Sequence, residues 1–199
     1  MTDLLELIRT RRSIRRYADR PVPPDLAEQL LTAAIWAPSA HNRQPWRFVV
    51  MEATATKERL AAAMGEQLRR DLAADGLAAE AIERDAGRSY ARISRAPLLV
   101  LLCLTLADMD DYPDARRRAN EAAMAAQSAA MAGQNLLLAA HALGLGACWL
   151  CAPLFCPGVV RATLDLPADW QPQGLITAGY PVEVKQKTRA SLETRVIYK

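Results

Sequence analysis

The sequence predicts an α+β or α/β layered fold, in which helices flank a central mixed sheet of four to five strands. Segments with helical and strand composition alternate along the chain. The run from Pro97 to Leu106 is apolar without alternation, which is typical of a strand buried on both faces. The segment from Asn120 to Leu143 is apolar nearly all round, which is typical of a helix buried on every side.

The first elements alternate between helix and extended chain. Leucine and isoleucine at helical spacing predict a short amphipathic helix over residues 4–8, and the composition of residues 13–17 favours an exit into extended chain. Pro24 is placed to open a second helix, because proline is favoured in the first helical turn. That helix runs to about Trp36 and is stopped by Pro38.

A polar loop from Pro38 to Pro45 leads into the next strand, Trp46 to Met51, whose residues mix apolar and β-branched types. Loops in such positions often carry functional residues. Alanine, leucine, glutamate and arginine at helical spacing then predict a helical excursion over about 56–94. This excursion is expected to cover the core.

The long helix expected at 120–143 ends at Gly144 and Gly146, in the usual manner of a helix C-cap. It carries small residues that suit close approach by a second backbone. They are Ala122, Ala126, Ala129, Ala130 and Gly133. A subunit interface and a central helix within one monomer both fit this pattern.

The C-terminal part supplies the remaining elements. Strands are expected at 147–151 and 174–180, with a short helix at about 157–164 between them. The tail from Thr194 to Tyr198 is a candidate fifth strand that could be exchanged with a partner.

Composition favours a single soluble domain over residues 1–199. The chain is 51% hydrophobic, which is enough for one core and less than two full domains usually need. The longest apolar run, Ala96 to Leu104, is too short to cross a bilayer, and the start does not have the pattern of a secretory signal. We therefore expect a cytoplasmic protein without a membrane span.

The four cysteines lie in apolar stretches and are expected to be reduced, buried and structural. Cys148 and Cys151 have the spacing of a redox pair, but a strand sends residues three apart to opposite faces. With only His41 and His141 as imidazoles, a zinc site built from the cysteines is not expected. We expect no metal site.

Motifs of several enzyme classes are absent from the sequence. It has no Gly-x-x-x-x-Gly-Lys-Ser/Thr loop, no His-Glu-x-x-His pair and no Gly-x-Ser-x-Gly elbow, which argues against phosphoryl transfer, zinc proteolysis and serine hydrolysis. Gly144 and Gly146 begin a dinucleotide fingerprint, but they follow a helix, and Trp149 stands at the third glycine position. No catalytic side chain is therefore predicted.

The densest basic segment runs from Thr10 to Tyr17. In extended chain, alternate side chains share a face, so Arg11, Ser13 and Arg15 are expected on one side. Guanidinium groups bind phosphate in a bidentate manner, and this face therefore suits an anionic ligand. A solvated basic turn is the other interpretation. A nucleic-acid patch is disfavoured, because no nucleic-acid-binding module accompanies the arginines.

A second segment, Pro38-Ser-Ala-His-Asn-Arg-Gln-Pro-Trp-Arg-Phe48, favours the anion-binding interpretation of the arginines over the solvated turn. Together the two segments resemble the nitroreductase family, whose members carry an Arg-Arg/His-Ser-x-Arg/Lys stretch and a later Pro-Ser-x-x-Asn-x-Gln-Pro-Trp-x-Phe loop. The matching residues are Arg11, Arg12, Ser13, Arg15, Pro38, Ser39, Asn42, Gln44, Pro45, Trp46 and Phe48. The long helix and the Leu-Gly-Leu-Gly-Ala-Cys-Trp run after it extend the resemblance over nearly the whole chain.

This resemblance implies a nitroreductase-like fold and a homodimer with the long buried helix at its interface. Two FMN sites would lie between the subunits, each lined by both chains. The N-terminal stretch would bind the phosphate and the ring of one FMN, through Arg11, Arg12, Ser13 and Arg15. The loop would contact that FMN from the other chain, through Pro38, Ser39, Asn42 and Gln44.

Two further pairs of residues complete the implied site. Lys187 and Arg189 stand where the family has a C-terminal basic pair that helps to hold the phosphate; an exposed polar tail is the other interpretation. The backbone at Cys151 and Ala152 would approach flavin N5. Many relatives have an acidic residue and a glycine there, so this departure leaves the choice of substrate open.

The activity that the resemblance implies is hydride transfer from NAD(P)H through flavin N5 to a small organic acceptor, in a ping-pong cycle. The acceptor would be a nitroaromatic, a quinone or an enone-like compound. The loop also resembles the nitroreductase-like domain associated with deazaflavin-cofactor biosynthesis, so a deazaflavin precursor is an alternative substrate. Flavin-fragmenting and dehalogenating relatives offer a third alternative. A flavin-binding protein without nicotinamide-dependent turnover is the rival from another class.

Overall fold

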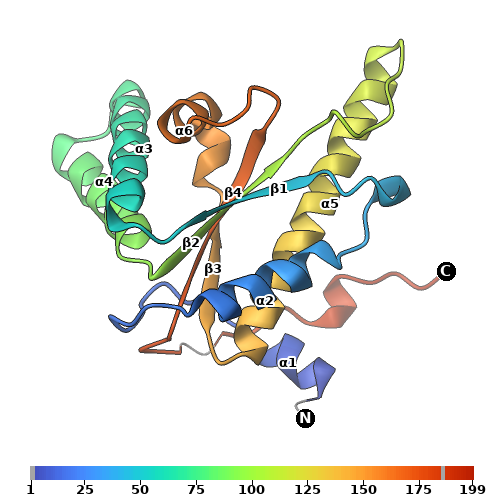
Figure 1. The fold of residues 1–199 in the computed structure, drawn as a ribbon, viewed down its shortest axis with the longest axis horizontal. Coiled ribbons are helices and arrows are strands. Elements are labelled where there is room, and N and C mark those ends of the chain that lie inside the picture. Colours follow the sequence, from blue (N-terminus) through green and yellow to red (C-terminus); the bar gives the residue numbers. More distant parts are fainter. Residues whose placement is uncertain (1–2, 185–186) are drawn as a thin grey trace.

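A four-stranded sheet forms the centre of the computed structural model, which describes residues 3–184 and 187–199 (Figure 1). The strands are β1 (Trp46–Met51), β2 (Leu98–Leu104), β3 (Gly146–Leu150) and β4 (Gln171–Gly179), in the order β1-β2-β4-β3. All three neighbouring pairs are antiparallel, so the expectation of a mixed sheet was wrong in this detail. Strand direction depends on the end of the sheet at which each connecting helix returns the chain, and composition does not reveal that end.

Six helices flank the sheet in the described residues. They are α1 (Leu4–Thr10), α2 (Pro24–Ile35), α3 (Thr54–Ala74), α4 (Ala79–Ser94), α5 (Ala115–Ala142) and α6 (Pro157–Leu164). Helices α2 and α5 cover one face of the sheet, whereas α3, α4 and α6 lie on the other (Figure 1). The α+β layered fold is confirmed, and the expected helical excursion is the packed pair α3 and α4. That residues 1–199 form a single domain stays a prediction.

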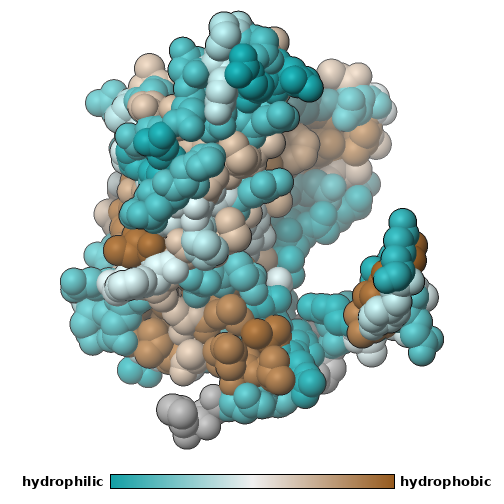
Figure 2. Space-filling view, turned by 90° about the vertical axis from the view of Figure 1, so that its right-hand side faces the viewer, coloured by the Kyte–Doolittle hydropathy of each residue, from teal (hydrophilic) through white to brown (hydrophobic). Residues whose placement is uncertain are grey.

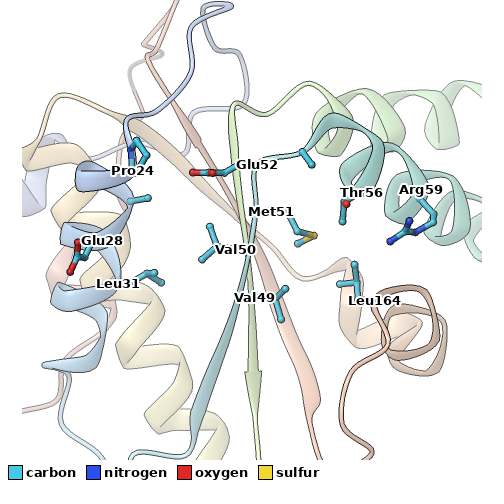
Figure 3. A pocket seen from close by; sticks show the side chains of 12 residues that line it. Pro24, Glu28, Leu31, Val49, Val50, Met51, Glu52, Thr56, Arg59 and Leu164 are labelled. Carbon is cyan, nitrogen blue, oxygen red and sulfur yellow. The ribbon is translucent and has the colours of Figure 1, made fainter.

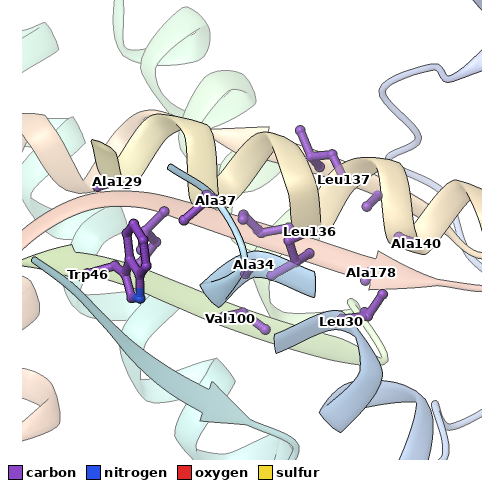
Figure 4. Close-up of a cluster of buried hydrophobic side chains, with 14 of the residues drawn as sticks. Leu30, Ala34, Ala37, Trp46, Val100, Ala129, Leu136, Leu137, Ala140 and Ala178 are labelled. Atoms are coloured by element: carbon purple, nitrogen blue, oxygen red, sulfur yellow. The ribbon is translucent and has the colours of Figure 1, made fainter. Parts of the chain in front are cut away.

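Strand β2 lies between the two layers of helices, and all of its residues are buried. Leu98, Val100 and Leu102 belong to the core shared with α2 and α5, part of which is drawn in Figure 4. Leu99 and Leu101 belong to the core shared with α3 and α6. A strand covered on both faces needs apolar side chains at every position, and this explains the run without alternation in the sequence.

Helix α5 is longer than expected and is not buried on every side of one chain. It begins at Ala115 because the Asp114 carboxylate accepts a hydrogen bond from the Arg117 backbone N–H, at 2.9 Å, and so caps the helix. Its middle turns leave Ala123, Gln127 and Met131 exposed. This exposed face carries no charge, which distinguishes it from an ordinary solvated helix face.

The small residues of α5 do not all face outward. Ala130 is exposed, but Ala129 and Gly133 are buried within the chain. A Cβ atom at Gly133 would lie 2.1 Å from Cζ3 of Trp149 on β3. Gly133 therefore serves close packing of the helix on its own sheet, and the interpretation of this glycine as a contact for a second backbone was wrong.

The tail does not form the expected fifth strand within the chain. It carries a short 3₁₀ turn, Leu192–Thr194, and then irregular chain. Figure 1 shows this C-terminal segment leaving the body of the molecule, and Figure 2 shows an arm that stands clear of the rest. Among the described residues, no helix combines the length and the apolar character needed to span a bilayer.

Candidate functional site

A cavity of about 910 Å³ lies where the two ends of the chain meet helix α4. It is lined by the basic segment 11–17, by residues of α4 and its C-cap Arg95, and by the C-terminal residues Val182, Glu183, Lys187 and Arg189. Six of the predicted site residues therefore come together in one place. They are Arg11, Arg12, Ser13, Arg15, Lys187 and Arg189.

The basic segment is held as extended chain along the edge strand β3. Ser13 pairs with Ala147 in a parallel bridge, and the backbone N–H of Ile14 donates to the carbonyl of Ala147 at 3.0 Å. Ile14 is buried against Gly146, where a Cβ atom would come within 2.7 Å of the isoleucine side chain. The second glycine of the Gly-Leu-Gly run is thus explained by this close approach.

Tyr17 fixes the far end of the segment. Its hydroxyl donates to the carbonyl of Ile14 at 2.5 Å and lies 2.7 Å from Oγ1 of Thr177 on β4. Burial is the main cause that raises the pKa of Tyr17, so the hydroxyl keeps its proton and its hydrogen bonds. These bonds hold the intervening arginines at the mouth of the cavity.

The cavity carries strongly unbalanced charge. Nine basic side chains line it, against the single carboxylate of Glu183, among the residues that the structure describes. Burial lowers the pKa of Arg11, and the like charges of Arg189 and Arg12 lower it further. The cavity therefore favours an anion strongly.

Arg12 differs from its neighbours because it binds the protein itself. Its Nη1 donates to the carbonyls of Arg9, at 2.5 Å, and Arg11, at 2.9 Å, and its Nη2 donates to the carbonyl of Lys187, at 3.4 Å. These bonds connect the N-terminal segment to the C-terminal one. The Nε of Arg12 is buried and has no hydrogen-bond partner. Buried polar groups usually have one, so this donor is suited to an acceptor that enters the cavity.

Helix α4 and its C-cap contribute three basic residues that the sequence did not indicate as site residues: Arg88 and Arg92 within the helix, and Arg95 at the cap. Burial, followed by the like charges of Arg15 and Arg88, lowers the pKa of Arg92, which places its guanidinium among the cations of the cavity. Their spacing of four and three residues along one helix face is the signal that could have identified them.

The loop with Pro38, Ser39, Asn42 and Gln44 lies elsewhere in the same chain. It leads into β1, which forms one edge of the sheet, whereas the basic segment lies along β3 at the opposite edge. None of these four residues is among the described residues that line the cationic cavity. One chain therefore does not bring the two motifs together.

The loop is internally ordered by its own polar groups. Ser39 Oγ accepts from the backbone N–H of Gln44 at 3.0 Å, and the Gln44 amide donates to Asn42 Oδ1 at 3.3 Å. The backbone N–H of Ala40 donates to Ser128 Oγ on α5 at 3.2 Å. Asn42 and Gln44 are both exposed, so their remaining donors and acceptors point to solvent in the single chain.

Cys151 and Ala152 follow directly after β3, where the 3₁₀ turn Ala152–Phe155 begins. Cys151 is exposed, so the expectation of four buried cysteines was wrong for this one, because it lies just beyond the covered part of the strand. Cys148 is buried beside the basic segment, and burial raises the pKa of its thiol. All four thiols are free.

A second cavity of about 600 Å³ lies on the outer side of β1, between α2 and α3 (Figure 3). Its walls are mostly apolar, with Glu28, Glu52 and Arg59 at the rim. It contains no predicted site residue, and its two carboxylates and one guanidinium give it no cationic character. The cationic cavity is therefore the stronger candidate for a functional site.

The fold and the cavity define a class of protein. It is an α+β protein in which N-terminal and C-terminal segments form a cationic cavity along one sheet edge. The sequence profile of the nitroreductase family matches residues 8–180. An NADH dehydrogenase of Thermus thermophilus is 33% identical over 197 residues, which cover 87% of this chain and 84% of the relative. A 5,6-dimethylbenzimidazole synthase of Rhodospirillum rubrum is 33% identical over 189 residues, 89% of this chain and 81% of the relative.

A solved structure extends the likeness to the whole fold. A protein described as a nitroreductase from Desulfovibrio desulfuricans, in complex with FMN, has 28% identity and a TM-score of 0.77, over 100% of this chain and 98% of the other. The chain belongs to the nitroreductase family and is an oxidoreductase of that family.

Proposed function

We propose that the protein is a homodimeric, FMN-dependent oxidoreductase that takes hydride from NAD(P)H and reduces a small organic acceptor. The observation that carries this proposal is the cationic cavity at the edge of β3. The D. desulfuricans relative contains FMN, whose phosphate is the kind of anion that such a cavity favours.

The residues present fit the phosphate end of FMN. Arg11 and Arg15 supply guanidinium groups in a cavity where the basic side chains outnumber the carboxylates among the described residues, and Lys187 and Arg189 add charge from the C-terminal part. The buried Nε of Arg12 is a donor without an acceptor. Bound FMN would supply the hydride-accepting chemistry, and the protein's part is to hold the phosphate, orient the ring and leave one face open.

The loop residues would complete the site across a twofold axis. Ser39, Asn42 and Gln44 are too far from the cavity to serve it within one chain, because they lie at the opposite sheet edge. A partner chain can bring them to it. The uncharged exposed face of α5 and the exposed leucines of α1 are the kind of surface that a partner covers. Figure 2 shows apolar side chains gathered on one face of the molecule.

The test of the cofactor is the visible spectrum of the purified protein and its response to a nicotinamide. We expect yellow protein that releases FMN on denaturation, and rapid bleaching of the flavin when NADH or NADPH is added without oxygen. Re-oxidation by a quinone or a nitroaromatic would then identify the acceptor class. Colourless protein that FMN does not reconstitute contradicts the proposal.

Flavin fragmentation is a second candidate function, and the similarity to a 5,6-dimethylbenzimidazole synthase shows that relatives of this chain include proteins named for other activities than nicotinamide oxidation. In that case the flavin is the substrate, and it is consumed when reduced enzyme meets oxygen. Chromatography of the released flavin distinguishes the two functions, because an oxidoreductase returns intact FMN after many cycles. A flavin-binding protein without turnover, or an enzyme for a deazaflavin precursor, would show no bleaching with either nicotinamide.

The dimer is tested separately by the mass of the FMN-loaded protein in solution. Sedimentation equilibrium is expected to give twice the chain mass of 21.8 kDa. Replacing exposed Met131 by glutamate should shift the mass toward one chain, because a charge on this face would be buried at the contact. A monomer that retains FMN would contradict the two-chain site.

A further inference from the structure

Three side chains with metal-binding groups lie close together. They are on the opposite side of the molecule from the basic segment of the cationic cavity. His41 comes from the 3₁₀ turn Ala40–Asn42, Asp110 from the loop between β2 and α5, and Glu121 from the second turn of α5. One ligand atom from each residue lies within 4.8 Å of the other two. Their positions in the sequence form no short motif, so sequence analysis predicted no metal.

Glu121 is the unusual member of this cluster. It is 5% exposed, and its carboxylate atom Oε2 is buried without a hydrogen-bond partner. A buried carboxylate without a partner is costly, and native structures usually pair it or let it bind a cation. His41 and Asp110 lie beside it and supply the other donor atoms that a cation needs.

In the described part of the chain, Oε2 of Glu121 has no hydrogen-bond partner, although Arg43 pairs with the neighbouring Asp110. Arg43 forms an ion pair with Oδ1 of Asp110. This contact holds the Asp110 carboxylate in place and leaves its second oxygen available. Metal ligands are commonly oriented in this way by a hydrogen-bonded neighbour. The two carboxylates and the one guanidinium leave a net negative charge in the cluster.

We propose that His41, Asp110 and Glu121 bind a divalent transition-metal ion, with Zn²⁺ as the best match. One imidazole nitrogen and two carboxylate oxygens are donors that Zn²⁺ accepts, at about 2.0–2.2 Å each. The present spacing needs only a small inward movement, and His41 is exposed and free to turn. Three protein ligands leave a fourth position for water.

Metal binding would join two parts of the chain that otherwise share few polar contacts. The turn with His41 lies within the loop of Ser39, Asn42 and Gln44, and Glu121 lies on α5. The ion would hold this loop on the helix. None of its three ligands lines the cationic cavity of the same chain, but His41 lies in the loop that would contact the FMN of a partner chain.

The experiment uses the full-length, tag-free protein, treated with EDTA, dialysed and titrated with ZnCl₂ in a calorimeter. We expect one Zn²⁺ per chain with a Kd of about 10 µM or lower, and a rise in melting temperature with Zn²⁺. His41→Ala and Glu121→Gln should each weaken binding at least about 10-fold. X-ray absorption at the zinc edge should show nitrogen and oxygen neighbours without sulfur.

His141→Ala is the matched control, because it removes the other histidine of the chain and should leave Zn²⁺ binding unchanged. His41 lies on an exposed turn, so its alanine variant should fold, and its circular dichroism and its melting temperature without zinc verify this. Absence of binding in the wild type overturns the proposal. Equal binding in the wild type and the His41→Ala variant, or sulfur neighbours from the exposed Cys151, also overturns it.

Discussion

Replacing Arg11 with alanine is expected to weaken FMN binding roughly 10- to 100-fold, which corresponds to the loss of a charge-assisted hydrogen bond of about 1.5–3 kcal/mol. Arg11 is half-buried at the mouth of the cationic cavity, and burial together with Arg189 and Arg12 lowers its pKa. Its guanidinium is therefore held among like charges, and an anion relieves that repulsion. Titration of the apoprotein with FMN, followed by quenching of flavin fluorescence, measures the affinity.

The matched control is Arg59→Ala. Arg59 is an exposed arginine that lines the apolar cavity between α2 and α3, so its loss should not affect FMN. Arg15→Ala is expected to weaken binding as Arg11→Ala does. If neither variant changes the affinity, the phosphate does not bind at this segment. The proposed dimer can form whether or not the FMN affinity changes. The mass of each variant in solution is therefore measured together with its FMN affinity.

Replacing Gly133 with alanine is expected to destabilise the fold by about 2 kcal/mol or more, because overpacked cores typically lose about 1–3 kcal/mol. The new methyl group would meet the Trp149 ring at 2.1 Å. The ring also packs closely on Gly174, where an added Cβ atom would lie 2.4 Å from Cε2 of Trp149, so it has little room to move. A fall in melting temperature of roughly 4–8 °C should accompany the change.

Gly87→Ala is the control for the helix itself. Gly87 lies within α4, and a Cβ atom there would meet nothing within 4 Å. This substitution is expected to stabilise the protein by up to about 1 kcal/mol, because alanine is the better helix former. Urea unfolding of both variants shows whether each substitution lowers or raises the free energy of unfolding. Equal stability of Gly133→Ala and the wild type would show that Trp149 is not confined.

The sequence predicts those parts of the fold in which the local pattern and the tertiary environment agree. Strand β2 is apolar at every position because helices cover both of its faces, so its burial was predictable. The start of α5 was missed because Arg116, Arg117 and Arg118 lower the apolar content of its first turns. Asp114 was nevertheless a visible N-cap signal for that start.

The site was predictable to the extent that it lies in short motifs. Arg11 and Arg15 could be selected from one segment, whereas Arg92 became visible only once α4 was packed beside that segment. The separation of Asn42 from the cavity depends on strand order, which composition does not determine. In the sequence, Glu121 is an isolated charge on an apolar helix, and only the fold places it beside His41.

The bond between the Arg12 guanidinium and the Lys187 carbonyl implies an order of events during synthesis. Since the cavity draws on residues 11–17 and on Lys187 and Arg189, it is incomplete until residue 189 has left the ribosome. Under the proposed function, a chain that stops before Lys187 would hold its flavin more weakly. Flavin content in a cell extract would therefore report chains that extend through Arg189.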